Sequence, residues 1–517
     1  MRFSRRNFIR WATSISTLAI AKPQPAIVLS LLGESGAPAQ AQSPTSQAPP
    51  QLFGDLANKP PVRPHPLDLD ANYIRMPLAS ADSVYGQLEG EHIKNFVREI
   101  TAIADKCRDD GNRWWGRIAG TKYDDMTEEL VETKFKQFGL QDVRRQYFDL
   151  PPQWFPISWD FVASGSGRTL KFDSLLPAPR SAPTSGAMDL DAVWVGLGNE
   201  ADFAGRDVRG KLVVICTWPM PGVVANSATY NGALKRAADK GAGAILVNVA
   251  IPGNFKIALN ANGGNVPTFT IGTDDANTLL ALIEKGPVKV RAQLATESRS
   301  GLRDANVWGV LPGTSDEDII VMAHHDSFFE GALDNASGMA VMLALAEYFS
   351  KVPKEQRRRT LKFLTTAGHH AGSLGTKWMH DNRETFLAKT ALMFNCEHVS
   401  VVQTYFDRTK PEMRKSTNID ARRWYVNGSD KLAAIVLNSY KTFGVTIYDQ
   451  MDPFTTGDMS HCDHDAPAIQ LIESAVFYHT DHDTPEIVPA PGLEAVARAY
   501  AKIIDQVNKI DRNAIIG

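Results

Sequence analysis

From residue 304 to its end, the chain alternates short apolar runs with longer stretches of helical periodicity. The apolar runs lie at 306–311, 318–323, 361–366, 391–395 and 468–471. Neighbouring parallel strands need a crossover connection, usually a helix, so this alternation predicts an α/β fold with a largely parallel or mixed sheet covered on both faces. In such sheets, functional side chains gather at the carboxyl ends of the strands.

Histidine and carboxylate residues follow the ends of these apolar runs. Of the 12 histidines, all but His65 and His92 lie from residue 324 onward. The run at 318–323 leads to His324 and Asp326, and Asp334 lies in the loop that follows. The later runs lead to His369 and His370, to Glu397, and to Tyr478 and His479. Imidazole and carboxylate suit zinc, and two such ions can polarise a carbonyl while activating water. The pattern predicts a metal-dependent hydrolase; the alternative is a set of unrelated surface histidines.

Length and composition limit the classes of protein to which the chain can belong. With 517 residues it is too long for one ordinary core, so we expect two or three domains. A hydrophobic content of 43% and a charged content of 22% are typical of a soluble globular protein. The formal net charge of −3 gives no electrostatic reason to expect a nucleic-acid partner. No apolar stretch beyond residue 45 is long enough to span a bilayer.

The N-terminus has the features of an export signal. Arg5 and Arg6 precede a moderately apolar region, and small residues follow at 39–41, a pattern similar to a twin-arginine signal peptide over 1–41. The alternative is a membrane anchor that is never removed. We expect a periplasmic or secreted protein with no stable membrane span after signal cleavage. The Ser-, Pro- and Gln-rich stretch that follows predicts a linker over 42–83.

The segments after the linker predict two different kinds of structure. Helical periodicity at 93–103 and 126–138 indicates that ordered structure begins near residue 84, and we expect 84–165 to form the first part of the domain that carries the histidine and carboxylate motifs. Over 170–300, short strand-like runs alternate with helices rich in small residues. The Gly-Lys strand entry at 210–211, the turn at 240–247 and the strand at 266–271 resemble the protease-associated domain. This resemblance implies a domain that borders a substrate cleft; the alternative is an unrelated α/β insert.

The order of the histidine and carboxylate motifs resembles that of the dizinc exopeptidases, a family that includes bacterial leucyl aminopeptidase and glutamate carboxypeptidase II. The matching motifs are His-x-Asp at 324–326, Gly-x-x-Asp-Asn-x-Ser-Gly at 331–338, Gly-Ser-x-Gly at 372–375, and Tyr-His-Thr at 478–480. The resemblance spans 84–165 and 301–512. It implies a three-layer αβα mixed sheet of the zinc exopeptidase type, a peptide substrate and two zinc ions, although another divalent metal is compatible with these ligands.

The resemblance also implies a role for each matching residue. His324 would bind the first metal, Asp334 would bridge both metals, and His479 would bind the second. Glu397 would complete the first metal's ligands, at a position where the family normally has Asp. The second metal's remaining ligand would be His370.

Two further residues would act next to these ligands. Asp326 would fix the ring of His324 by a hydrogen bond. Tyr478 would donate a hydrogen bond to the developing oxyanion; its alternative is an interior tyrosine with a satisfied hydroxyl.

The chain departs from the family pattern at His369 and His370, where the family has two adjacent glutamates. The first glutamate is the general base and the second is a metal ligand. Imidazole is a good zinc ligand, so His370 is a mild replacement. His369 can serve as a base at neutral pH, but nearby dications would weaken its basicity. A base lost without replacement would cost on the order of 10²–10⁴ in rate.

The remaining histidines and the cysteines carry weaker signals. His461 and His464 lie where the family has a loop lining the specificity pocket. His325 and His398 flank ligand positions, and adjacent strand residues should point the other way. Four cysteines in so long a chain do not form a disulfide framework, and either a Cys396–Cys462 bridge or free thiols would fit the sequence.

Three functions therefore stay open. The chain is expected to be an exported, aminopeptidase-like metal-dependent exopeptidase that hydrolyses terminal peptide bonds with metal-activated water. One alternative is a catalytically impaired homologue that binds metal and peptide without hydrolysis. The other is glutaminyl-cyclase-like chemistry on the same fold with a single zinc. Neither the choice between amino- and carboxypeptidase activity nor the oligomeric state can be deduced from the sequence.

Overall fold

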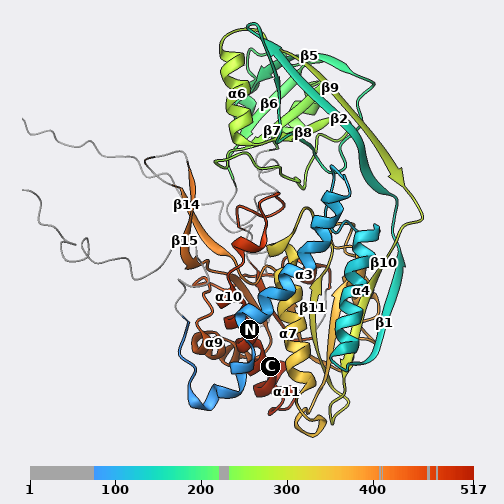
Figure 1. Cartoon of the computed structure of the whole chain (residues 1–517), viewed down its shortest axis with the longest axis vertical. Coiled ribbons are helices and arrows are strands. Elements are labelled where there is room, and N and C mark those ends of the chain that lie inside the picture. Colours follow the sequence, from blue (N-terminus) through green and yellow to red (C-terminus); the bar gives the residue numbers. More distant parts are fainter. Residues whose placement is uncertain are drawn as a thin grey trace, which may run out of the picture. The chain divides into compact units, whose positions relative to one another are not determined.

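The computed structural model describes residues 75–219, 232–406, 409, 412–462, 466–472 and 475–516. The expected signal peptide, the linker up to residue 74 and His464 lie outside these residues. Among the described helices, none combines the length and the hydropathy that crossing a membrane requires. A seven-stranded and an eight-stranded sheet organise this part of the chain (Figure 1).

The seven-stranded sheet is mixed, as the alternation of apolar runs and helices predicts. Its order is β1 (Gln141–Asp149), β10 (Arg303–Leu311), β12 (Thr360–Thr366), β11 (Asp318–His324), β13 (Thr390–Cys396), β17 (Ala468–Ile472) and β16 (Arg423–Asn427). The four strands from β12 to β17 are parallel, and the outer pairs are antiparallel. The carboxyl ends of β11, β12 and β13 therefore meet at one edge of the sheet.

Residues of β11 alternate between two apolar layers. Ile319 and Val321 pack into a large core with helices α3 (Gly90–Asp109), α4 (Lys122–Gln137), α7 (Gly338–Ser350), α9 (Asp430–Phe443) and α10 (Ala490–Val507). Ile320 and Met322 pack on the opposite face against α8 (Leu374–Asp381) and η6 (Gly457–His461). Because side chains of a strand alternate between its two faces, this pattern makes a three-layer αβα arrangement, which confirms the expected fold class.

The eight-stranded sheet belongs to a segment inserted between β1 and β10. Its order is β3 (Arg168–Lys171), β2 (Gln153–Gly165), β9 (Lys289–Arg299), β5 (Met188–Trp194), β6 (Leu212–Thr217), β7 (Ala244–Val249), β8 (Thr268–Ile271) and β4 (Leu176–Pro177). Helices α5 (Ala233–Asp239) and α6 (Thr273–Glu284) accompany it. Since β1 and β10 are neighbours, the insert leaves and re-enters the first sheet at the same place.

The insert begins earlier in the chain than expected. We placed 84–165 in the catalytic domain, but β2 pairs with β9 from Gln153 to Ser164 and so lies in the second sheet. The prolines at 151, 152 and 156 obscure this strand in the sequence, because proline is unusual inside a sheet. At the other end, η1 (Ser80–Gln87) begins within the expected linker, and the Tyr85 hydroxyl donates to Asp505 at 2.8 Å.

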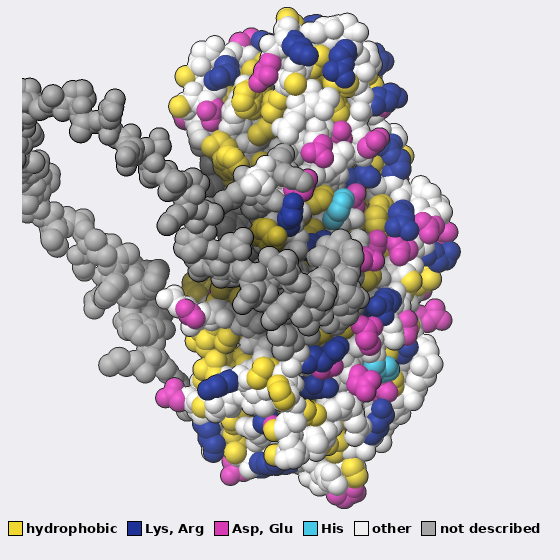
Figure 2. Space-filling view, turned by 60° about the vertical axis from the view of Figure 1, so that its left-hand side comes forward, with side chains coloured by type: hydrophobic (Ala, Val, Ile, Leu, Met, Phe, Trp, Pro, Cys, Tyr) yellow, Lys and Arg dark blue, Asp and Glu magenta, His cyan; other side chains and the backbone are white. Residues whose placement is uncertain are grey.

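Short elements complete the chain. They are η2 (Glu200–Phe203), η4 (Ala332–Ser337), η5 (Lys354–Gln356), the hairpin of β14 (Val402–Phe406) and β15 (Met413–Ile419), η7 (Pro485–Ile487) and α11 (Asn513–Ile516). On the face of the molecule that Figure 2 shows, basic and acidic side chains are interspersed over the described surface, which agrees with the small net charge.

A glycine joins α7 to the end of β13. A Cβ atom at Gly338 would lie 2.0 Å from the Cys396 carbonyl oxygen and 2.4 Å from Asn335 Oδ1. The Asn335 side chain donates to that same carbonyl at 3.0 Å and accepts from the Gly338 amide at 3.2 Å. The close approach of Gly338 to Cys396 and the two hydrogen bonds of Asn335 thus hold the loop that carries Asp334 against the end of β13, just before Glu397.

We expect Gly338→Ala to destabilise the fold by about 1–3 kcal/mol, the usual cost of an overpacked core, because backbone on both sides must move. Urea unfolding of the two proteins measures the difference. Gly86→Ala is the matched control, since its Cβ would meet only the flexible end of Leu78, at 3.2 Å. An equal stability of Gly338→Ala and wild type would contradict the proposed close packing.

Candidate metal centre

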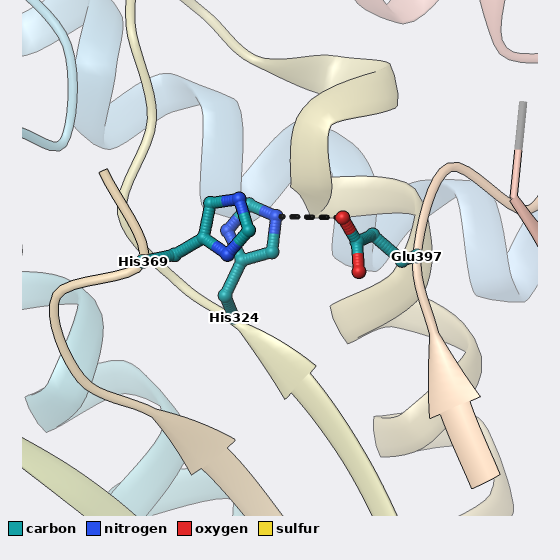
Figure 3. A group of neighbouring side chains, drawn as sticks. All are labelled: His324, His369 and Glu397. Atoms are coloured by element: carbon teal, nitrogen blue, oxygen red, sulfur yellow. Dashed lines mark ion pairs between the residues drawn. The ribbon is translucent and has the colours of Figure 1, made fainter. Parts of the chain in front are cut away.

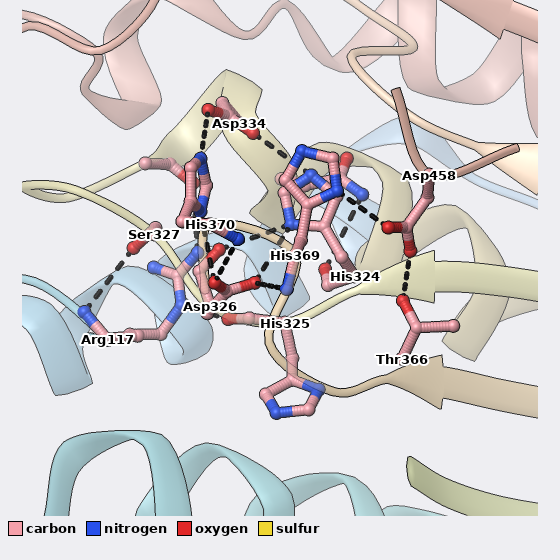
Figure 4. A network of polar contacts seen from close by, with 12 residues as sticks. Arg117, His324, His325, Asp326, Ser327, Asp334, Thr366, His369, His370 and Asp458 are labelled. Atoms are coloured by element: carbon pink, nitrogen blue, oxygen red, sulfur yellow. Dashed lines mark hydrogen bonds and ion pairs between the residues drawn. The ribbon is translucent and has the colours of Figure 1, made fainter. Parts of the chain in front are cut away.

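Asp334 lies at the centre of the residues that the sequence analysis selected. Its Oδ1 atom is 3.1 Å from His324 Nε2 and 2.9 Å from His398 Nε2. Its Oδ2 atom is 3.1 Å from His479 Nε2 and 3.5 Å from His370 Nε2. One buried carboxylate thus faces two histidine pairs, one at each oxygen. Figure 4 shows Asp334 with His324 and His370, one member of each pair.

The other ring nitrogens fix how these histidines point. His324 Nδ1 is 3.2 Å from the Asp326 carbonyl oxygen, and His370 Nδ1 is 3.1 Å from the Asp326 carboxylate. His479 Nδ1 is 3.2 Å from the carbonyl oxygen of Ala258, which belongs to the insert. With their Nδ1 atoms held at these oxygens, the three rings direct their Nε2 atoms at Asp334. Asp326 thus contacts two histidines, His324 through its carbonyl oxygen and His370 through its carboxylate.

The Nε2 atoms of His370 and His479 lie only 3.0 Å apart. Burial lowers the pKa of His479 to about 4. Burial also acts to lower the pKa of His370, but Asp326 and Asp334 outweigh it and raise that pKa to about 9. The short distance fits a proton shared between the two Nε2 atoms. A metal cation at the same point would displace that proton, because metal binding releases protons from its ligands.

His369 contacts a residue that the sequence analysis did not select. Its Nδ1 atom is 2.6 Å from Asp458 Oδ1, and its ring stacks on the ring of His324 with centroids 4.0 Å apart (Figure 3). Burial acts to lower the pKa of His369, but the Asp458 carboxylate raises it to about 10. Asp458 also accepts a hydrogen bond from the Thr366 hydroxyl at the end of β12. Asp458 does not follow an apolar run, so no local pattern in the sequence indicates that it lies beside His369.

Glu397 follows β13 and points toward His324 (Figure 3). Its Oε1 atom is 4.0 Å from His324 Nε2. Its Oε2 atom accepts hydrogen bonds from Asn395 Nδ2 at 2.7 Å and from the Asp458 amide at 3.1 Å. The structure thus brings Glu397 to the site without a direct contact to Asp334.

His398 lies in the site, and our expectation that it points away was wrong. Strand β13 ends at Cys396, and His398 has a φ of 51°, so the alternation of a strand no longer applies to it. His325 does point away. Its Nε2 atom is 3.1 Å from Asp304 Oδ1 and 3.3 Å from Asp124 Oδ1, in a buried cluster on the α4 side of the sheet.

A cleft of about 500 Å³ opens beside the histidines. His369, His370, Tyr478 and His479 line it, together with residues of the insert and of the loops around it: Trp154, Arg180, Leu259 and Asn260. His461 also lines the cleft and is exposed, whereas His464 lies outside the described residues. Burial raises the pKa of Tyr478 well above its usual value, so its hydroxyl stays protonated. The four cysteines, all among the described residues, form no disulfide, so Cys396 and Cys462 are not bridged.

The donor atoms fit a pair of metal ions. Sets of three ligand atoms within 4.8 Å of one another include His324, Asp334 and His398, and Asp334, His370 and His479. Two ligand atoms that lie 2.0–2.1 Å from one tetrahedral ion are about 3.3–3.4 Å apart, close to the distances around Asp334. His324 Nε2 and Asp334 Oδ2 are buried and make no hydrogen bond. Short contacts without hydrogen bonds are typical of ligands that share a cation.

The sequence of residues 306–504, which includes all of these residues, matches peptidase family M28. The match covers 199 of the 517 residues of the chain. Among its relatives, Aminopeptidase YwaD of Bacillus subtilis is 26% identical over 384 residues, which are 72% of this chain and 74% of that protein. The Probable glutamate carboxypeptidase VP8 of Zea mays is 24% identical over 441 residues, 71% of this chain and 60% of that protein.

Solved structures of M28-type peptidases share the fold. The peptidase M28 precursor of Shewanella amazonensis has a TM-score of 0.63 at 18% identity, covering 83% of this chain and 96% of that one. A zinc aminopeptidase of Bacillus subtilis has a TM-score of 0.58 at 20% identity, covering 83% of this chain and 98% of that one. At these identities the likeness establishes the fold, and the roles of the individual site residues stay predictions.

We expect Asp334→Asn to lower the metal affinity of both halves of the site by more than about 100-fold, because its carboxylate faces both histidine pairs. Mutation of a residue that only hydrogen-bonds to a metal ligand already costs about 10–100-fold in affinity, and loss of a shared ligand should cost more. Metal content per chain, measured after dialysis against a fixed zinc concentration, tests this. His461→Ala, at the exposed side of the cleft, is the control and should keep the wild-type content. Wild-type metal content in Asp334→Asn would contradict the assignment of Asp334 as a ligand that both histidine pairs share.

Proposed function

We propose that this chain is an exported zinc-dependent exopeptidase, aminopeptidase-like, that hydrolyses terminal peptide bonds. The observation that carries the proposal is the buried Asp334 carboxylate between two histidine pairs, at the strand ends beside a cleft. The names of the relatives, an aminopeptidase and a probable carboxypeptidase, support an exopeptidase and leave open which terminus is cleaved.

Zinc bound here would polarise the scissile carbonyl and make water a stronger nucleophile at neutral pH. His369 would take the proton from that water at Nε2, since its Nδ1 is held by Asp458 at 2.6 Å. Dications nearby lower the basicity of an imidazole, and the Asp458 carboxylate acts in the opposite direction. The contact to Asp458 therefore supports His369 as a base in place of a glutamate.

Tyr478 would stabilise the oxyanion that forms as the carbonyl is attacked. Its ring stacks on that of His479, with centroids 3.7 Å apart, and it lines the cleft. A protonated hydroxyl at the edge of a metal centre can donate a hydrogen bond where negative charge develops. Residues of the insert border the same cleft and would contact the peptide next to the scissile bond.

One observation favours a second candidate, a homologue that binds metal and peptide without hydrolysis. The pKa of His369 is about 10 in the metal-free protein, so this ring is protonated at neutral pH and cannot accept a proton in that state. The two candidates differ in whether the loaded protein releases a terminal residue.

We expect His369→Ala to lower kcat by about 10²–10⁴, the usual contribution of a general base, with unchanged zinc content. Asp458→Asn should lower kcat in the same direction by a smaller factor, because it removes the carboxylate that orients the ring. Release of amino acids from short peptides measures both effects, and His92→Ala, far from the site, is the control. A wild-type protein that binds zinc and cleaves no peptide would favour the second candidate.

We also propose export through the twin-arginine pathway. The supporting features are Arg5 and Arg6 ahead of an apolar stretch and the small residues at 39–41. Replacing both arginines by lysine should leave the protein in the cytoplasm with its N-terminus uncleaved. Fractionation of cells that express each form, followed by N-terminal sequencing, measures the outcome. Processing of the double-lysine form at the wild-type level would contradict this route.

A further inference from the structure

His398 shares an oxygen of Asp334 with His324. The Nε2 atoms of the two rings lie 2.9 Å and 3.1 Å from Asp334 Oδ1, and the three residues form one of the sets that could hold an ion. On the other side of the carboxylate, His370 and His479 share Oδ2 in the same manner. The two halves of the site therefore have the same composition.

The backbone at His398 is built to turn its ring inward. Its φ of 51° lies in the left-handed region, which residues with a Cβ atom rarely adopt. The His398 amide donates to Asn335 Oδ1 at 3.2 Å, and Asn335 Nδ2 donates to the Cys396 carbonyl at 3.0 Å. His479, which the sequence already selects as a ligand, has the same left-handed backbone with a φ of 57°. Non-glycine residues in this region occur preferentially at functional sites.

Glu397 is engaged elsewhere. Its Oε2 atom accepts two hydrogen bonds, from Asn395 and from the Asp458 amide, and its Oε1 atom remains 4.0 Å from His324 Nε2. A Cβ atom at Gly457 would lie 2.0 Å from that Oε1, so the carboxylate packs closely against the glycine. His398 is thus nearer than Glu397 to the point at which His324 and Asp334 converge.

We propose that His398 is a ligand of the first metal, one residue beyond the expected ligand Glu397, so that each metal is held by two histidines and one oxygen of Asp334. This inference rests on the proposed function in that it takes the site to hold two ions. Four imidazole nitrogens and one shared carboxylate suit Zn²⁺, Co²⁺ or Cu²⁺, and they suit Mg²⁺ or Mn²⁺ poorly, since these ions prefer oxygen ligands.

A crystal structure of the zinc-loaded full-length protein tests the assignment directly. We expect His398 Nε2 at 2.0–2.1 Å from the first zinc, about the usual zinc–nitrogen distance. Zinc coordinated by Glu397, with His398 still hydrogen-bonded to Asp334, would overturn the inference and leave the proposed function standing. A protein that takes up no zinc would overturn both.

Zinc content of variants provides a second, independent measurement. His398→Ala should keep the ion at His370 and His479 and lose the other, falling from two zinc ions per chain to one, whereas Glu397→Gln should keep both. The retained ion serves as the internal control for folding. Two ions in His398→Ala would overturn the inference, as would loss of an ion from Glu397→Gln alone. Should the alanine variant fail to fold, the zinc-loaded wild-type structure decides.

Discussion

The site depends on one carboxylate, because Asp334 is the group that all four converging histidines share. Its own position is fixed from the backbone: Asp483 accepts hydrogen bonds from the amides of Leu333 at 2.6 Å and Asp334 at 3.1 Å. The histidines come from the ends of β11 and β13, from the loop after β12, and from the segment at 475–480. A single buried anion thus draws together segments that are up to 155 residues apart in sequence, from His324 to His479, and its electrostatic contacts are strong because burial excludes water.

The backbone around Asp334 carries strain that the packing sustains. His398 and His479 both adopt the left-handed conformation, at a cost of roughly 1–2 kcal/mol each. Each is held by an outside contact: His398 by the Asn335 side chain, and His479 by the carbonyl oxygen of Ala258 in the insert. The insert therefore does more than border the cleft, since one of its carbonyl groups orients a residue of the site. Strain that is held in this way at two histidines of one cluster is easier to explain by function than by folding alone.

The sequence predicted those strands and helices whose hydrophobic residues recur at regular spacing. Alternating apolar runs placed five of the seven strands of the first sheet, all but β1 and β16, and the residues at the ends of these runs, such as His324 and Glu397, came to one edge. His398 was misplaced because the alternation of β13 was extended past Cys396, where the strand ends and the backbone turns. Asp458 was missed because it lies in the short η6, which has no hydrophobic periodicity, and β2 was missed because prolines interrupt its pattern. These residues contact partners that are far away in the sequence, so local sequence patterns could not predict the contacts.

The two adjacent histidines, His369 and His370, each have a carboxylate behind them. His369 Nδ1 is 2.6 Å from Asp458, and His370 Nδ1 is 3.1 Å from Asp326. Neutral rings alone would leave a dinuclear site short of negative charge. A carboxylate one imidazole away, at about 6 Å, still attracts each unit of positive charge by about 3 kcal/mol at an effective dielectric constant of 20. A carboxylate thus lies one ring behind each of the two histidines, and its charge makes both rings more basic than isolated imidazoles. In this arrangement part of the negative charge that bound cations require comes from Asp458 and Asp326, behind the rings, and part from Asp334 between the histidine pairs.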